Sequence, residues 1–160
     1  MSEDLFTPEF LQALHSFILQ AKAATYVGSG APSESSRPSS HDLRYTQGDF
    51  AYLDSYFGSA DFIGEEAVYY RGLPVWGENY YGRLLRPDLI RAEEAGQVLK
   101  ESLFKMYAEG RFLGGWDYQT VRGRYIDQNE GEWTAFTGKE MILQQEIQVY
   151  ELHYHGGLIR

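Results

Sequence analysis

The chain has 160 residues, of which 43% are hydrophobic and 23% charged, a balance typical of one globular domain that buries a core. Fourteen Lys and Arg against 23 Asp and Glu give a net charge of −9, which disfavours a nucleic-acid partner because a phosphate backbone attracts clustered basic residues. The absence of cysteine excludes disulfides, thiolate metal sites and cysteine nucleophiles.

The first residues are acidic where a signal peptide carries positive charge, and no apolar run reaches the roughly 20 residues of a membrane span. We therefore expect a cytoplasmic protein with no membrane partner. Aromatic residues make up 16% of the chain, and the 13 Tyr among them suit half-buried strands and pocket walls. This composition favours a sheet-rich protein.

Thr7 and Pro8 have the pattern of a helix start, with a capping hydroxyl ahead of a proline at the first helical position. Apolar residues then recur at spacings of three and four as far as Ala21, which predicts an amphipathic helix over residues 8–23. We expect a short strand at 24–27. Residues 28–40 are small, polar and turn-forming, so we expect a mobile loop there.

Short segments rich in Tyr, Phe and Val follow, separated by glycines at the spacing of an antiparallel meander. The expected strands lie at 41–47, 49–57, 62–70 and 73–82. Arg86-Pro87-Asp88 predicts the start of a second amphipathic helix, which should end near Gly110. Further strands are expected at 116–127, 131–137, 138–145 and 147–156.

The two halves of the chain resemble each other at a fixed offset. Phe62, Gly64, Glu66 and Val68 correspond to Phe136, Gly138, Glu140 and Ile142 at an offset of 74, and Tyr52-Leu53-Asp54 corresponds to Tyr125-Ile126-Asp127 at an offset of 73. We interpret this pattern as an internal repeat, with halves at about 8–84 and 87–160 of a single domain covering 1–160. Chance similarity between aromatic, glycine-rich hairpins is the alternative.

The predicted fold class is α+β: a tandem α-βββ repeat with one antiparallel sheet, or two abutting sheets, and two helices packed on one side. In such an arrangement each unit's helix covers its own sheet face only in part, so the two units would pack together. A pocket is then expected between the halves.

Arg37 to Gly82 contains four distinctive segments. These are Ser40-His41-Asp42-Leu43, the stretch from Tyr45 to Asp54, Phe62-Ile63-Gly64-Glu65-Glu66, and a strand from Pro74 to Tyr80. In these features the chain resembles a bacterial family catalogued as domain of unknown function 5680. The resemblance implies a sensing or interaction role, since members look like stand-alone small proteins or follow a helix-turn-helix segment in regulators. It implies no activity and no catalytic residues. The family pattern has an apolar residue where this chain has Glu78, which would alter a pocket there.

Glu66 and Glu140 are corresponding residues of the two halves, so a twofold arrangement would bring them to related places. Paired carboxylates serve either in acid–base chemistry or in holding a cationic ligand. Alternatively they form ion pairs with Arg71, Arg83 or Arg124, or face water. Recurring aromatic residues would line the same groove or else pack in the core. The candidate ligand-binding residues are Glu66, Trp76, Asn79, Tyr80, Glu140, Tyr150, His153 and Tyr154.

His153 and His155 stand two apart on a predicted strand, which points both imidazoles to one face and makes them a candidate metal pair. The competing interpretation is two half-exposed histidines near the end of the chain. Gly28-Ser29-Gly30 has neither the length of a nucleophile elbow nor the final glycine of a dinucleotide fingerprint, and there is no P-loop. We therefore expect no cofactor.

These observations favour a small-ligand-binding or sensor-like module with an aromatic and acidic pocket between the two halves. One alternative is a hydrolase or isomerase that uses glutamate acid–base chemistry. Another is an interaction module that forms a homodimer and thereby covers exposed sheet edges. The sequence names neither a ligand nor a reaction.

Overall fold

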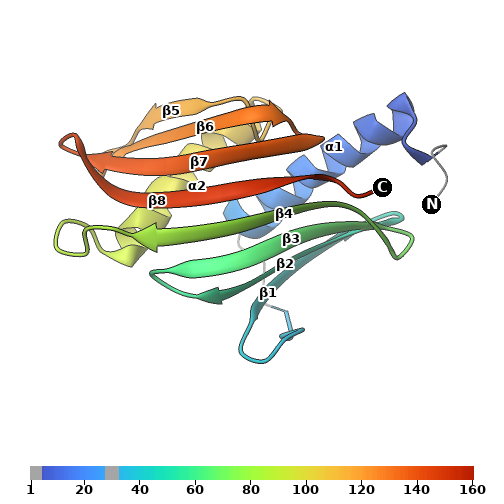
Figure 1. Cartoon of the computed structure of the whole chain (residues 1–160), viewed down its shortest axis with the longest axis horizontal. Helices are drawn as coiled ribbons and strands as arrows, with labels where there is room; N and C mark the ends of the chain where they lie inside the picture. Colours follow the sequence, from blue (N-terminus) through green and yellow to red (C-terminus); the bar gives the residue numbers. More distant parts are fainter. Residues whose placement is uncertain (1–4, 28–32) are drawn as a thin grey trace.

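The computed structural model describes residues 5–27 and 33–160 of the chain. In these residues it contains two α-helices and one eight-stranded antiparallel sheet, so the predicted α+β class is confirmed (Figure 1). The elements in chain order are α1 (Pro8–Lys22), a π-helical turn η2 (Ala23–Val27), β1 (His41–Gln47), β2 (Phe50–Gly58), β3 (Phe62–Tyr70), β4 (Leu73–Leu84), α2 (Ala92–Ala108), β5 (Trp116–Gln119), β6 (Arg124–Glu132), β7 (Ala135–Gln144) and β8 (Ile147–Leu158).

The strands lie in the order β1-β2-β3-β4-β8-β7-β6-β5, so the first four and the last four meet at the central pair β4 and β8. Both helices lie behind the sheet in the view of Figure 1, and one face of the sheet is therefore covered while the other faces the viewer. α1 contacts β1 and β2, and α2 contacts β5 and β6. The hydrophobic core and the polar site described below lie between the helices and this covered inner face.

Helix α1 begins as predicted, because the Thr7 hydroxyl accepts a hydrogen bond from the Phe10 amide at 3.2 Å and Pro8 occupies the first turn. Its apolar stripe is buried against the sheet, where the Phe17 ring stacks on Phe50 with centroids 5.0 Å apart. The expected strand at 24–27 is wrong: the helix continues into the π-helical turn η2. The Thr25 hydroxyl supports this turn by donating to the Ala21 carbonyl at 2.7 Å.

The sequence predicted that the second helix starts at Arg86-Pro87-Asp88, but α2 begins at Ala92, six residues after Arg86. Residues 86–90 form a turn, in which the Arg86 guanidinium donates two hydrogen bonds to the Asp88 carboxylate. The helix begins at Ala92, where the Glu94 carboxylate accepts a hydrogen bond from the Arg91 amide at 3.0 Å. The Pro87 signal therefore marked a turn rather than a helix start.

The strand boundaries of the first half and of β8 agree with the predictions to within two residues, but those of the other three strands of the second half do not. The predicted strand 116–127 is in fact two strands, β5 and β6. They are joined by a turn in which the Thr120 hydroxyl donates to the Gly123 carbonyl and accepts from the Gly123 amide. The two predicted strands 131–137 and 138–145 are largely one, β7. Each helix is consequently followed by four strands and not by three.

Several backbone features recur in the two halves. A register shift falls between Val68 and Tyr69 in the β3–β4 pair and between Ile142 and Leu143 in the β7–β8 pair. Both hairpins turn through two residues with positive φ, Arg71-Gly72 and Gln145-Glu146, as two-residue turns with the twist of antiparallel strands require. Two-residue turns of this kind set the register of each hairpin and so determine which residues point inward.

The segment predicted as a mobile loop lies partly outside the described residues, which resume at Ser33. From there to Ser40 it is tied to the buried carboxylate of Asp42, which accepts from the Ser36 amide at 2.9 Å, the Ser40 hydroxyl at 2.8 Å and the Ser55 hydroxyl at 2.7 Å. Burial alone would raise the pKa of Asp42, but these hydrogen bonds outweigh it and hold the pKa well below its usual range. The Ser40-His41-Asp42 motif therefore anchors this segment to β2.

Candidate functional site

Five carboxylates point from the sheet toward the helices. Glu66 on β3 lies two residues before Val68, which is fully buried, so the alternation of a strand places both on the inner face. The other four are Asp54 on β2, Glu78 on β4, Asp127 on β6 and Glu140 on β7. We call these five residues the acidic cluster. They lie side by side as direct cross-strand partners, Asp54 with Glu66, Glu66 with Glu78, and Asp127 with Glu140.

Lys22, the last residue of α1, supplies the positive charge of the cluster. Its ammonium donates to Glu66 Oε2 at 2.7 Å and to Glu78 Oε2 at 3.0 Å, and all three side chains are about nine-tenths buried. Burial alone would lower the pKa of Lys22, but the two carboxylates outweigh it and raise the pKa well above its usual value. Lys22 therefore stays charged and joins α1 to two strands at the centre of the sheet.

Two tyrosines bond the aspartates in the same way in the two halves. The Tyr80 hydroxyl donates to Asp54 Oδ1 at 2.5 Å, and the Tyr154 hydroxyl donates to Asp127 Oδ1 at 2.7 Å. Each tyrosine stands opposite a glycine, Gly64 or Gly138, where a β-carbon would collide with its ring. The glycines thus let the rings lie across the neighbouring strand and reach the aspartates.

Burial raises the pKa of four of the five carboxyl groups. It raises the pKa of Asp54 to about 7, reinforced by Glu66 and opposed by the hydrogen bond from Tyr80. It raises the pKa of Glu78 to about 7 against the attraction of Lys22, and the pKa of Asp127 to about 6 against the hydrogen bond from Tyr154. The pKa of Glu140 rises to about 8, through burial and then through Asp127 and Glu78. These four carboxyl groups therefore change between their protonated and ionised forms near neutral pH.

A cavity of about 720 Å³ adjoins the acidic cluster between the inner sheet face and the helices. This volume is within the range of small-molecule sites. Its polar end is lined by Lys22, Asp54, Glu66, Glu78, Tyr80, Tyr107 and Glu140. Its apolar wall is lined by Phe62, Leu84, Ala95, Leu99, Leu103, Tyr150 and Leu152. The cavity is thus lined by both ionisable and apolar side chains.

The α2 side of the cavity contains a glycine that no steric contact requires. Gly96 lies inside the helix and lines the cavity, and a β-carbon there would meet nothing within 4 Å. A glycine inside a helix costs about 1 kcal/mol relative to alanine. Its presence keeps this part of the cavity open at the expense of helix stability.

The predicted site residues divide between the two faces of the sheet. Glu66, Tyr80, Glu140 and Tyr150 line the inner cavity. Trp76 is fully buried in the core, where its indole N–H donates to the Trp133 carbonyl at 3.0 Å, and Tyr154 is buried and bonded to Asp127. Asn79 and His153 instead lie on the outer face, so the eight residues do not form one site.

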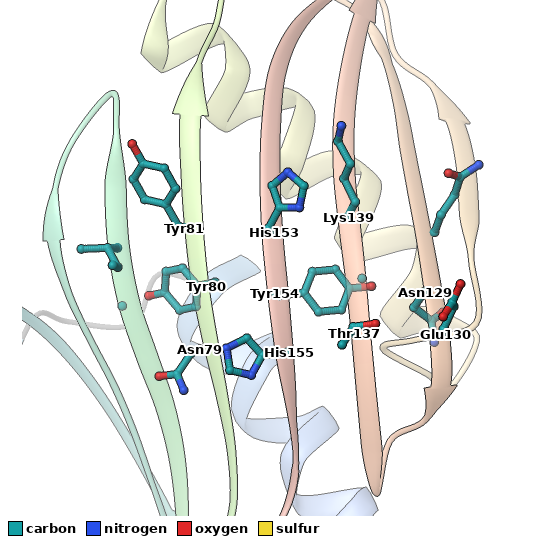
Figure 2. Close-up of a pocket in the computed structure, with 14 residues that line it drawn as sticks. Asn79, Tyr80, Tyr81, Asn129, Glu130, Thr137, Lys139, His153, Tyr154 and His155 are labelled. Atoms are coloured by element: carbon teal, nitrogen blue, oxygen red, sulfur yellow. The ribbon is translucent and has the colours of Figure 1, made fainter.

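Figure 2 shows Asn79, Tyr81, His153 and His155 together on the outer face of the central strands β4 and β8. They line a shallow hollow of about 790 Å³ that continues over Thr137 and Lys139 of β7. The His153 side chain is 61% exposed and lies 3.9 Å from Glu151. In the part of the chain that the structure describes, no group of three or more His, Asp or Glu side chains is arranged to hold a metal ion.

Sequence reasoning missed Lys22, Asp54, Tyr107 and Asp127 as parts of the inner site, and it noted Glu78 only as a departure from the family pattern that would alter a pocket. Lys22 has the pattern of an ordinary lysine in the last turn of a helix, where it favours the helix dipole. Asp54 and Asp127 did appear as corresponding residues of the two halves, and this correspondence is a signal that could have added them. At the offset of 74 that relates Glu66 to Glu140, Glu78 corresponds to Leu152, so the acidic cluster is larger in the first half.

Fold and site together define an α+β protein with a buried acidic cavity between a twisted antiparallel sheet and two helices. The model of the family described as "Domain of unknown function (DUF5680)" matches residues 54–159, and the chain belongs to this family. The match covers four of the five acidic-cluster strands in full and β2 from Asp54 onward. Comparisons with curated proteins and with solved structures give no match. None of the described helices is long and apolar enough to span a membrane.

Proposed function

We propose that this protein is a small-ligand-binding, sensor-like module whose ligand occupies the cavity beside the acidic cluster. The observation that carries the proposal is the cavity itself, which has a volume of about 720 Å³ and is lined by buried ionisable side chains of the acidic cluster. Clefts that combine an apolar wall with a few convergent polar groups of shifted pKa are the usual form of a ligand site.

The energetics of the acidic cluster support a functional role. Carboxylates directly opposite each other on neighbouring strands are destabilising, and the row Asp54, Glu66 and Glu78 contains two such pairs. A buried ion pair such as that of Lys22 is often no better for stability than well-packed apolar residues. Stability alone therefore gives no reason for this arrangement, whereas ligand binding does.

The position of the site at the centre of the sheet fits an internal duplication, which we propose as its origin. The mirrored strand order, the matched register shifts and the two Tyr–Asp hydrogen bonds support two related α-ββββ units. In this view the difference between Glu78 and Leu152 is a divergence between the halves. The first half keeps an extra carboxylate and its partner Lys22, and the second half provides apolar wall.

Thermal-shift screening of the purified protein against a metabolite library tests the binding proposal. A ligand present at one hundred times its dissociation constant adds about 2.7 kcal/mol to the stability of the folded state. The matched control is the Gly96→Trp variant, which places an indole in the cavity from a helix position where a β-carbon meets nothing within 4 Å. We expect hits that shift the wild type and not the variant. A library without hits, or hits that shift both proteins equally, would contradict binding in this cavity.

A second candidate is an enzyme that uses glutamate acid–base chemistry, a hydrolase or an isomerase. The observation that favours it is the raised pKa of Glu140, about 8, in the same cavity as the Glu66 carboxylate that Lys22 holds. A protonated and an ionised carboxyl in one site are the two partners of acid–base catalysis. Activity on ester, glycoside and isomerase substrate panels that disappears in Glu66→Gln and in Glu140→Gln would favour this candidate over simple binding.

A further inference from the structure

We propose that the ligand is an organic amine, with an apolar body on the cavity wall and a protonated amino group beside Glu140. This inference rests on the proposed binding function and names its chemical class. It follows from the charge count of the site and from the lining of its wall.

The acidic cluster contains more carboxyl groups than basic partners. Lys22 is the one basic side chain among the described residues that makes an ion pair with the cluster, and it is shared between Glu66 and Glu78. Lys100 and His41 also line the cavity, but both are exposed and neither makes an ion pair with the cluster. Glu140 lines the cavity and makes no ion pair with a described basic side chain, and Asp127 and Glu78 add to the effect of burial in raising its pKa, against Tyr125 and Lys22. A buried carboxylate gains most from a cation that arrives with the ligand.

The remainder of the cavity determines the other end of the ligand. The apolar side chains of the lining are Phe62, Leu84, Leu99, Leu103, Tyr150 and Leu152, and Leu152 is the cross-strand neighbour of Glu140. An anionic ligand would meet the cluster with like charge, and a neutral one would leave Glu140 without a cation. An amine on an aromatic or aliphatic body satisfies both ends, and its size is limited by the 720 Å³ of the cavity.

Matched sets of compounds test the charge preference. Each set has one body (benzene, indole or biphenyl) and three head groups, as in tryptamine, tryptophol and indole-3-propanoate. Isothermal titration calorimetry at pH 7.5 should show the amine of at least one set binding at least tenfold more tightly than its alcohol, and its carboxylate not binding. In Glu140→Gln the amine should lose at least tenfold in affinity while the alcohol is unaffected. Glu65→Gln, which removes an exposed carboxylate from the opposite face of β3, is the control and should leave both affinities unchanged.

Proton release provides a readout that a merely structural role of Glu140 would not produce. Glu140 faces Asp127 and Tyr125 on β6, Glu78 on β4, Lys22 on α1 and Tyr107 on α2, and its carboxyl is partly protonated near neutral pH. Binding of an ammonium should ionise it, so the binding enthalpy should depend on the ionisation enthalpy of the buffer in the wild type. This dependence should be reduced in Glu140→Gln.

The possible failures are distinguishable. If alcohols or carboxylates bind as tightly as amines, and Gly96→Trp abolishes that binding, the amine inference is overturned while the binding function stands. If Glu140→Gln weakens amine and alcohol equally, the role of its charge is refuted. If no head group on any body binds, and the metabolite library gives no hit either, both proposals fall.

Discussion

Replacing Lys22 by methionine is the most direct probe of the acidic cluster. Methionine keeps the length of the side chain and its contact with the aromatic rings of Trp76 and Phe112, which lie 5.6 Å and 5.3 Å from the ammonium. It removes the ammonium group that donates to Glu66 at 2.7 Å and to Glu78 at 3.0 Å. The variant therefore isolates the electrostatic role of Lys22 from its packing.

Removing one partner of a buried ion pair costs about 3–5 kcal/mol, because the other charge stays buried without compensation. We expect the lower end of this range, since Glu78 already has a pKa of about 7 and takes up a proton when Lys22 is lost. For a chain of this length, about 3 kcal/mol corresponds to a fall in melting temperature of about 6–12 °C. Urea unfolding followed by circular dichroism measures the free energy of unfolding directly.

The loss should depend on pH and on the partners of Lys22. Without the lysine, the carboxyl of Glu78 has a folded-state pKa even further above its unfolded value, so the variant gains stability as pH falls and its deficit is largest at alkaline pH. The double variant Lys22→Met/Glu66→Gln should recover part of the loss, because it removes one of the uncompensated charges. A loss below about 1 kcal/mol at pH 7, with no change between pH 6 and 8, would refute the buried ion-pair network, because exposed pairs have this size.

Three further predictions concern the cavity and its surroundings. Gly96→Ala should raise stability by about 1 kcal/mol, because it removes a helix glycine without creating a clash; an unchanged or lower melting temperature would show that the glycine is needed sterically. Burial raises the pKa of Glu140 to about 8, above its usual value of 4.5, so the folded chain binds more protons than the unfolded chain between these values. Stability should consequently fall as pH rises from about 5 to 8, and differential scanning calorimetry should show a shallower slope for Glu140→Gln than for Glu65→Gln. Gly138→Ala should destabilise the protein by about 1–3 kcal/mol, because its β-carbon collides with the ring of Tyr154. Gly72→Ala is the comparison, since its β-carbon meets no atom and its effect comes only from the positive φ of the turn.

Much of the architecture could be predicted from local patterns. The Thr7-Pro8 start, the apolar spacing of α1 and the boundaries of β1 and β3 were correct because these signals act between residues close in sequence. The second half was less accurate for a local reason as well. The Thr120 turn divides a continuous aromatic stretch into β5 and β6, and side-chain hydrogen bonds of this kind are not visible in a hydrophobic pattern.

The sequence by itself determined the α+β class and the correspondence of Glu66 with Glu140, since hydrophobic patterns and fixed offsets depend on residue order alone. Only the tertiary structure decided which of these residues meet. It placed Lys22 between two strands that are 44 and 56 residues away, and it put Asn79 and His153 on the face opposite Glu66. Strand order and helix docking bring distant residues together, and burial at that point turns ordinary carboxylates into groups that exchange protons near neutral pH.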